Sequence, residues 1–178
     1  MADVVYPDEV VTNALIREVD LTAFGASGKL ALITIDNGMD HTRPTTLGPQ
    51  SMRNINAAID QALAMNPAGI AITGKPFILA AGADLSGITA LTNADDAKTI
   101  IKFGHDAYAK LRTSKIPTFC FVNGLALGGG TELALSCQYR TVAATAFIAL
   151  PEVFIGLVPG WSGVTILPKM VRSEEHTS

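Results

Sequence analysis

The chain has 178 residues, of which 48% are hydrophobic and 16% are charged, and its formal net charge is −3. This length and composition are typical of one rather apolar globular domain, or a large part of one, and exclude an intrinsically disordered chain. The slight negative charge gives no electrostatic case for binding nucleic acid or an anionic membrane, and no apolar run is long enough to span a bilayer.

The N-terminal segment is acidic and lacks the apolar core of a signal peptide, so we expect a cytoplasmic protein. Residues 15–21 and 30–36 are rich in aliphatic and β-branched side chains. A glycine-containing break at 25–28 separates them, which predicts a β-hairpin.

Helices and strands are expected to alternate after the hairpin. Apolar residues recur at three- and four-residue steps from Met52 to Leu63, as on one face of a helix. Asn93 is expected to cap a second helix. The expected elements are a helix from Pro49 to about residue 66, a strand at 69–74, an extended segment at 77–81, a helix from 93 to about 115, and strands at 117–122, 139–144 and 147–150. This order predicts an α/β fold with a parallel sheet.

Histidines and cysteines form no metal-binding or nucleophilic motif in this sequence. His41 and His105 are far apart, and neither belongs to a metal-ligand spacing. A serine hydrolase built from Ser136 and His105 has no support, because the sequence has no GxSxG motif. Cys120 and Cys137 are isolated in apolar surroundings, so we expect buried thiols rather than a disulfide.

A glycine-rich bend precedes a further helix that we expect after residue 128. Gly128, Gly129 and Gly130 leave bare N–H groups at the helix N-terminus, where the helix dipole favours negative charge. Glu132 lies in the first turn. The pattern suits an oxyanion with an acid or base beside it. A tight turn in which Glu132 only complements the helix dipole fits the local pattern equally well.

A second small-residue bend, at 80–85, follows the extended segment. Its small side chains allow the backbone to approach a ligand closely, and Ala83 could present another N–H group. The alternative is an ordinary turn in which Asp84 bonds to its own backbone.

A lone carboxylate, Glu152, follows Pro151 in an apolar setting. Burying it is costly unless it has a partner or a task, and a poised carboxyl would suit proton transfer. A surface glutamate at the end of a strand is the alternative. The glycine-punctuated loop at 156–163 could close over a pocket.

Together these stretches resemble the crotonase (enoyl-CoA hydratase/isomerase) superfamily. The motifs AAGADL at 80–85, NGLALGGGTELA at 123–134 and LPEVFIGLVPGWSG at 150–163 occur in the family's order and spacing. Three ordered motifs are far more specific than one. The resemblance covers about residues 15–171 and implies the crotonase-like α/β fold, a spiral of β-β-α units.

The resemblance also implies residue roles. In the family, two backbone N–H groups hold the thioester oxygen of an acyl-CoA, and the matching residues are Ala83 and Gly129. Two glutamates of the family's hydratases match Glu132, which would activate water, and Glu152, which would deliver a proton to the α-carbon. The other residues expected to contact the substrate are Ala81, Gly82, Asp84, Leu85, Gly128 and Pro151. No metal and no bound cofactor are implied for this chain, since coenzyme A is part of the substrate.

The implied reaction is hydration of trans-2-enoyl-CoA to 3-hydroxyacyl-CoA in fatty-acid β-oxidation, with Δ3–Δ2 isomerisation as a related activity. Another crotonase activity, such as thioester hydrolysis, is a second possibility, although those branches rarely keep both glutamates. A non-catalytic acyl-CoA-binding module is a third.

Within the family, the motifs at 74–88 and 157–163 and the Gly104-His105 pair are similar to the hydratase part of the alpha subunits of bacterial multifunctional fatty-acid oxidation complexes. An NAD-dependent dehydrogenase region follows the hydratase in those proteins, so NAD is expected only in such a downstream region. The resemblance also implies a homo-oligomer, typically a trimer, or a thiolase-containing complex.

The end of the sequence departs from this pattern. A helix opens at 166–171, and RSEEHTS at 172–178 then follows in polar residues. This heptapeptide also matches the translation of a widely used DNA-sequencing adapter. We therefore expect a hydratase/isomerase domain at 1–171, incomplete because the family's C-terminal helices are missing, and a non-native tail at 172–178.

Overall fold

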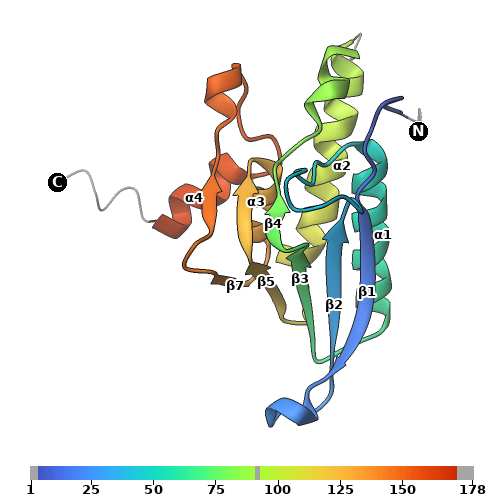
Figure 1. Ribbon diagram of the computed structural model, residues 1–178, viewed down its shortest axis with the longest axis vertical. Helices are drawn as coiled ribbons and strands as arrows, with labels where there is room; N and C mark the ends of the chain where they lie inside the picture. The colour runs from blue at the N-terminus through green and yellow to red at the C-terminus, as the bar shows by residue number, and fades with distance from the viewer. Residues whose placement is uncertain (1–3, 91–92, 172–178) are drawn as a thin grey trace, which may run out of the picture.

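A computed structural model describes residues 4–90 and 93–171, and the tail expected at 172–178 lies outside this part of the chain. The described residues form two sheets with helices packed against them (Figure 1). The larger sheet has the strand order β1-β2-β3-β5-β7, and the smaller one has the order β4-β6-β8. Only β1 and β2 pair antiparallel, and all the other strand pairs are parallel. The predicted α/β fold with a parallel sheet is confirmed.

The strands of the larger sheet are β1 (Asn13–Asp20), β2 (Lys29–Asp36), β3 (Gly69–Gly74), β5 (Thr118–Val122) and β7 (Tyr139–Val142). Those of the smaller sheet are β4 (Phe77–Ala80), β6 (Gly124–Leu127) and β8 (Phe147–Ala149). The α-helices are α1 (Pro49–Ala64), α2 (Ala94–Arg112), α3 (Gly129–Ser136) and α4 (Gly163–Val171). Three short 3₁₀ helices are η1 (Thr22–Phe24), η2 (Leu85–Ala90) and η3 (Glu152–Ile155).

After α1 the same unit occurs three times. Each unit places one strand in the larger sheet and the next strand in the smaller sheet, and then adds an α-helix, in the orders β3-β4-α2, β5-β6-α3 and β7-β8-α4. This is the spiral of β-β-α units that the resemblance implied. Because all strands of the smaller sheet run parallel, their carboxyl ends meet at one edge.

The predicted helix starts have clear local causes. The Asn93 side chain accepts hydrogen bonds from the N–H groups of Asp95 and Asp96 and so caps α2, as expected. Glu9, from the segment before β1, accepts bonds from the N–H groups of Gln50 and Ser51 in the first turn of α1. The last helix, α4, begins at Gly163, three residues earlier than the expected 166.

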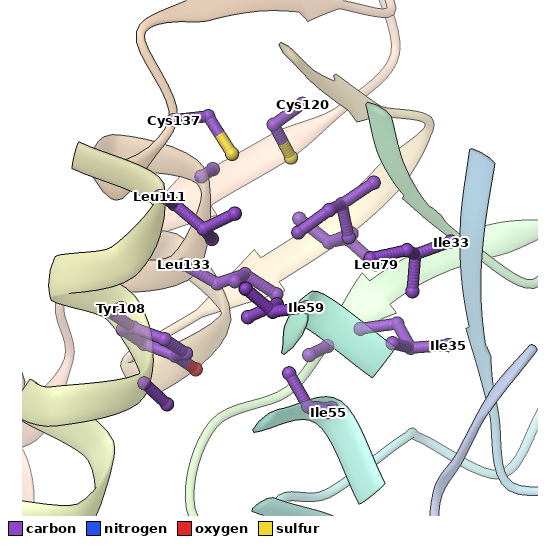
Figure 2. Packing of buried hydrophobic residues seen from close by; sticks show 14 of the residues in the cluster. Ile33, Ile35, Ile55, Ile59, Leu79, Tyr108, Leu111, Cys120, Leu133 and Cys137 are labelled. Atoms are coloured by element: carbon purple, nitrogen blue, oxygen red, sulfur yellow. The ribbon is translucent and has the colours of Figure 1, made fainter. Parts of the chain in front are cut away.

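The core lies where α1, α2 and α3 pack on the two sheets (Figure 2). Cys120 and Cys137 are free thiols in this core, as predicted. The labelled side chains in Figure 2 come from β2, α1, β4, α2, β5, α3 and the residue after α3: Ile33, Ile35, Ile55, Ile59, Leu79, Tyr108, Leu111, Cys120, Leu133 and Cys137. Each fully buried aliphatic or aromatic side chain stabilises the fold by about 1.5–3 kcal/mol relative to an exposed one.

The buried side chain of Lys75 binds the loop that precedes α1. The Nζ atom of Lys75 donates to the side-chain oxygen of Asn37 and to the backbone carbonyls of Met39, Asp40 and Arg43. These bonds satisfy a charge that would otherwise be costly to bury. They also fix the chain that leads to residues 45–47, which line the bend after β4.

None of the helices within residues 4–90 and 93–171 is both long enough and apolar enough to cross a membrane.

Candidate active site

The bend after β4 and the N-terminus of α3 lie against each other. A Cβ atom built on Gly82 would lie 3.7 Å from the backbone nitrogen of Gly129 and 3.2 Å from the carbonyl oxygen of Leu127. The parallel pairing of β4 with β6 produces this contact, because both strands end at the same edge of the small sheet. The two glycine-rich motifs of the sequence therefore belong to one site.

Several backbone donors in this region remain unused, among them the two that the sequence singled out. Residues 45–47 pair with the bend: Ala81 N–H donates to Thr45 O, Leu47 N–H to Gly82 O, and Asp84 N–H to Leu47 O. Among the described residues, the N–H groups of Ala83 and Gly129 have no hydrogen-bond partner. Gly129 is the first residue of α3, where the helix dipole adds positive potential. Such donors are suited to binding an oxygen that gains negative charge.

At each of residues 128–130 a neighbouring atom leaves no room for a Cβ atom, so the fold requires glycine there. A Cβ atom on Gly128 would lie 2.8 Å from Glu152 Oε1, and Gly128 has a φ of +48°. A Cβ atom on Gly129 would lie 2.2 Å from Cζ3 of Trp161, and one on Gly130 would lie 2.2 Å from the carbonyl oxygen of Ala80. The bare backbone is therefore a packing requirement and also exposes the N–H groups of the helix start.

Glu132 lies in the first turn of α3 and is 2% exposed. Its Oε1 atom accepts hydrogen bonds of 2.7 Å from the N–H groups of both Trp161 and Gly163. Burial raises the pKa of the Glu132 carboxyl above its usual value, the two N–H bonds partly offset this, and the charge of Glu152 raises the pKa further. Within the described residues Oε2 has no hydrogen-bond partner, so one oxygen is fixed and the other is available for chemistry.

Glu152 is the first residue of η3, directly after Pro151. Its Oε1 atom lies beside Gly128, and its Oε2 atom is buried without a hydrogen-bond partner in the described chain. An unpaired buried carboxylate oxygen is costly unless a ligand or water completes it. Since its charge also acts on Glu132, the structure brings the two predicted carboxylates into one site.

Helix α2 supports the donor end of the site. The hydroxyl of Tyr108 donates to the carbonyl oxygen of Gly129 at 3.0 Å, and its ring meets that of Trp161 edge to face at 5.7 Å. Burial raises the pKa of Tyr108 well above its usual value, so the phenol stays a neutral donor. A Cβ atom on Gly104 would lie 2.3 Å from Nε1 of Trp161, so this ring fits between two glycines, Gly104 and Gly129.

Asp84 and Leu85, which the resemblance implies as substrate contacts, directly follow the bend residues. The carboxylate of Asp84 accepts bonds from the N–H and hydroxyl groups of Ser86, which is the local turn that we considered as the alternative. Leu85 is largely exposed at the start of η2. Ala81 and Gly82 belong to the bend itself, and the N–H of Ala81 is already bonded to Thr45.

The loop at 156–163 was expected near a pocket, but the individual contacts that support the site could not be predicted from the sequence pattern. Tyr108 and the N–H groups of Trp161 and Gly163 reach the site from positions far away along the chain. His105 bonds to Ser162, while the Ser136 hydroxyl accepts from Arg112, so no serine–histidine nucleophile forms from Ser136 and His105. Among the described residues, no three His, Cys, Asp or Glu side chains gather closely enough to hold a metal ion.

Comparisons with known proteins agree with this geometry. The sequence model of the enoyl-CoA hydratase/isomerase family matches residues 26–176. The alpha subunit of the fatty acid oxidation complex of Shewanella loihica is 41% identical over 104 residues, which cover 57% of this chain and 15% of that protein. The same subunit of Shewanella amazonensis is 34% identical over 146 residues, which cover 80% of this chain and 20% of that protein.

A solved enoyl-CoA hydratase from Bacillus anthracis superposes with a TM-score of 0.76 at 24% identity, over 92% of this chain and 61% of that structure. This likeness supports the fold. The chain thus spans no more than about a fifth of the length of the two curated relatives, and about three fifths of the solved hydratase.

Proposed function

Since this chain belongs to the enoyl-CoA hydratase/isomerase family, we propose that it adds water across the double bond of trans-2-enoyl-CoA thioesters and yields 3-hydroxyacyl-CoA in fatty-acid β-oxidation. One observation carries the proposal: two unpaired backbone N–H groups lie beside two partly or fully buried carboxylates, Glu132 and Glu152. A stabilised enolate with an adjacent acid and base is what this reaction requires.

The N–H groups of Ala83 and Gly129 bind the thioester oxygen in this proposal. When water attacks the β-carbon, the π electrons of the double bond move toward that oxygen and form an enolate. Fixed donors stabilise the enolate more than the ground state, and removing one such donor costs about 2.7–4 kcal/mol in comparable sites. Tyr108 supports this step by holding the carbonyl of Gly129 and with it the start of α3.

The two carboxyls divide the proton transfers. Glu132 takes a proton from the attacking water through its unbonded Oε2, while its Oε1 stays bound to Trp161 and Gly163. Glu152 delivers a proton to the α-carbon as the enolate collapses. Proton exchange with solvent then restores both carboxyls.

The same enolate would also permit Δ3–Δ2 isomerisation, in which a proton leaves one carbon and returns to another without addition of water. Substrate binding at the bend would involve Ala81, Gly82, Asp84, Leu85, Gly128 and Pro151. By analogy with the fatty acid oxidation subunits, an NAD-dependent step would belong to a separate downstream region and not to the residues described.

The test is to incubate the purified protein with crotonyl-CoA in ¹⁸O-labelled water and to identify the product by mass spectrometry. Hydration predicts a 3-hydroxyacyl-CoA with one labelled oxygen. Release of free coenzyme A would indicate thioester hydrolysis instead. Binding of a saturated acyl-CoA without any conversion of the enoyl thioester would favour a non-catalytic binding module.

A further inference from the structure

A histidine outside the proposed catalytic pair bonds to the loop that holds Glu132. Nδ1 of His105, on α2, lies 2.9 Å from the hydroxyl oxygen of Ser162. Ser162 is 7% exposed, and its φ is +97°, in the left-handed region that favours glycine. A non-glycine residue in this region is strained and persists only where its surroundings hold it.

Ser162 stands between the two donors of Glu132. The N–H groups of Trp161 on one side and Gly163 on the other both reach Oε1. The carbonyl of Ser162 accepts from the N–H groups of Thr165 and Ile166 and so begins α4. The backbone conformation of Ser162 therefore sets the direction of both N–H groups that fix Glu132.

We infer that His105 is a positioning residue for Glu132: by holding the Ser162 hydroxyl, it keeps the Trp161 and Gly163 N–H groups on one carboxylate oxygen and leaves the other oxygen free. In either ring tautomer the histidine nitrogen and the hydroxyl satisfy each other. His105 forms no bond to Ala83, Gly129 or Glu152 among the described contacts. The inference rests on the proposed role of Glu132 as the base.

Loss of the His105 contact should raise the pKa of Glu132. The two N–H bonds lower the pKa of Glu132, whereas burial and the charge of Glu152 raise it. Tyr108 also faces Glu132 and stays neutral. If the loop relaxes, the pKa of Glu132 rises, and the base becomes available only at higher pH. Binding of acyl-CoA, which depends on the unaltered bend and α3, stays near the wild-type value.

The experiment compares His105→Ala, His105→Asn, Ser162→Ala and the double variant His105→Ala/Ser162→Ala. The control is Asp106→Asn, which removes an exposed ion pair with Lys102 on the same helix. We expect His105→Ala and Ser162→Ala each to lower kcat about 10- to 100-fold with little change in KM, and to move the acidic limb of the pH–rate profile to higher pH. Asparagine can place an amide atom near the Nδ1 position, so His105→Asn should restore most of the activity.

The double variant should lose no more activity than the single variants, because both changes break the same contact. Equal loss in His105→Asn and His105→Ala, an unchanged pH profile in His105→Ala, or full additivity in the double variant would overturn the inference.

A second measurement does not need turnover. Difference infrared spectroscopy follows the carboxyl stretching band of Glu132 against pH, with Glu132→Gln to assign the band. His105→Ala should shift this titration to higher pH, and Asp106→Asn should leave it in place. If the titration shifts but no variant hydrates enoyl-CoA, the positioning role stands and the proposed function fails; an unshifted titration overturns the positioning role.

Discussion

Glu132 carries a carboxyl that is almost fully removed from water, yet the chain provides two N–H donors for only one of its oxygens. Its pKa is raised, chiefly by burial. A carboxyl with a raised pKa in the folded state contributes most to stability when protonated, at pH values below the pKa of the unfolded chain. This contribution is lost as the pH rises through the folded-state pKa. Burying the Glu132 carboxylate therefore lowers the free energy of unfolding at neutral pH, and this same carboxylate is the proposed base.

Glu132→Gln should consequently become more stable than the wild type as the pH increases. The glutamine keeps an oxygen that can accept from Trp161 and Gly163 but has no charge to bury. Each unit by which the wild-type pKa is raised corresponds to about 1.4 kcal/mol. Thermal unfolding of both proteins from acidic to neutral pH measures the effect. A constant difference in stability across that range would contradict the buried-charge account.

The sequence predicted which side chains the candidate site contains better than it predicted which contacts hold them in place. Glu132 and Glu152 stood out because each is a lone carboxylate in an apolar, glycine-rich setting. Tyr108, His105 and Ser162 gave no such indication, because their partners lie 21 and 57 positions away in sequence. Lys75 was missed for the same reason, since its acceptors lie on a preceding loop.

One indole ring packs against both α2 and α3, in addition to the direct hydrogen bonds between these helices. Trp161 packs against Gly104 on α2 and Gly129 on α3, where added Cβ atoms would lie 2.3 Å and 2.2 Å from its ring. Ring and backbone atoms cannot yield as a flexible side-chain end can. The orientation of the α3 N-terminus, and with it the Gly129 N–H, depends on this contact.

Gly104→Ala should lower the free energy of unfolding by about 1–3 kcal/mol through overpacking. Urea denaturation followed by circular dichroism measures this. Gly160→Ala is the matched control, because a Cβ atom there meets only Ile101, at 3.7 Å. In a Trp161→Leu background the cost of Gly104→Ala should shrink, and an unchanged cost there would contradict the contact.

The order of elements was predictable, and the division into two sheets was not. Hydrophobic periodicity located α1, α2 and the strands of the larger sheet within a few residues. The four-residue strand β6, however, was not expected, since so short a run has no detectable period. The pairing of β4, β6 and β8 depends on contacts across the chain that no local pattern contains.

An exposed apolar region spans η3 and the loop that follows it. Phe154 is 88% exposed and Val158 is 75% exposed, and the neighbouring Val153 and Ile155 are 74% and 54% exposed. Monomers seldom expose contiguous apolar surface of this kind. We propose that this region contacts a second copy of the chain.

The variant Phe154→Ser/Val158→Ser should therefore have a smaller mass in solution than the wild type, as measured by light scattering coupled to size-exclusion chromatography. Phe24→Ser is the control, because Phe24 is 76% exposed but lies in η1 at the hairpin. A monomeric wild type, or an equal effect of Phe24→Ser, would contradict the assignment.

The most direct test of the proposed function is the rate of crotonyl-CoA hydration by the wild type, Glu132→Gln and Glu152→Gln, followed as loss of the enoyl-thioester absorbance. Each glutamine variant should keep acyl-CoA binding while kcat falls about 10²–10⁴-fold, the contribution typical of a general acid or base. Hydration at the wild-type rate by both variants would contradict the roles assigned to these two carboxylates.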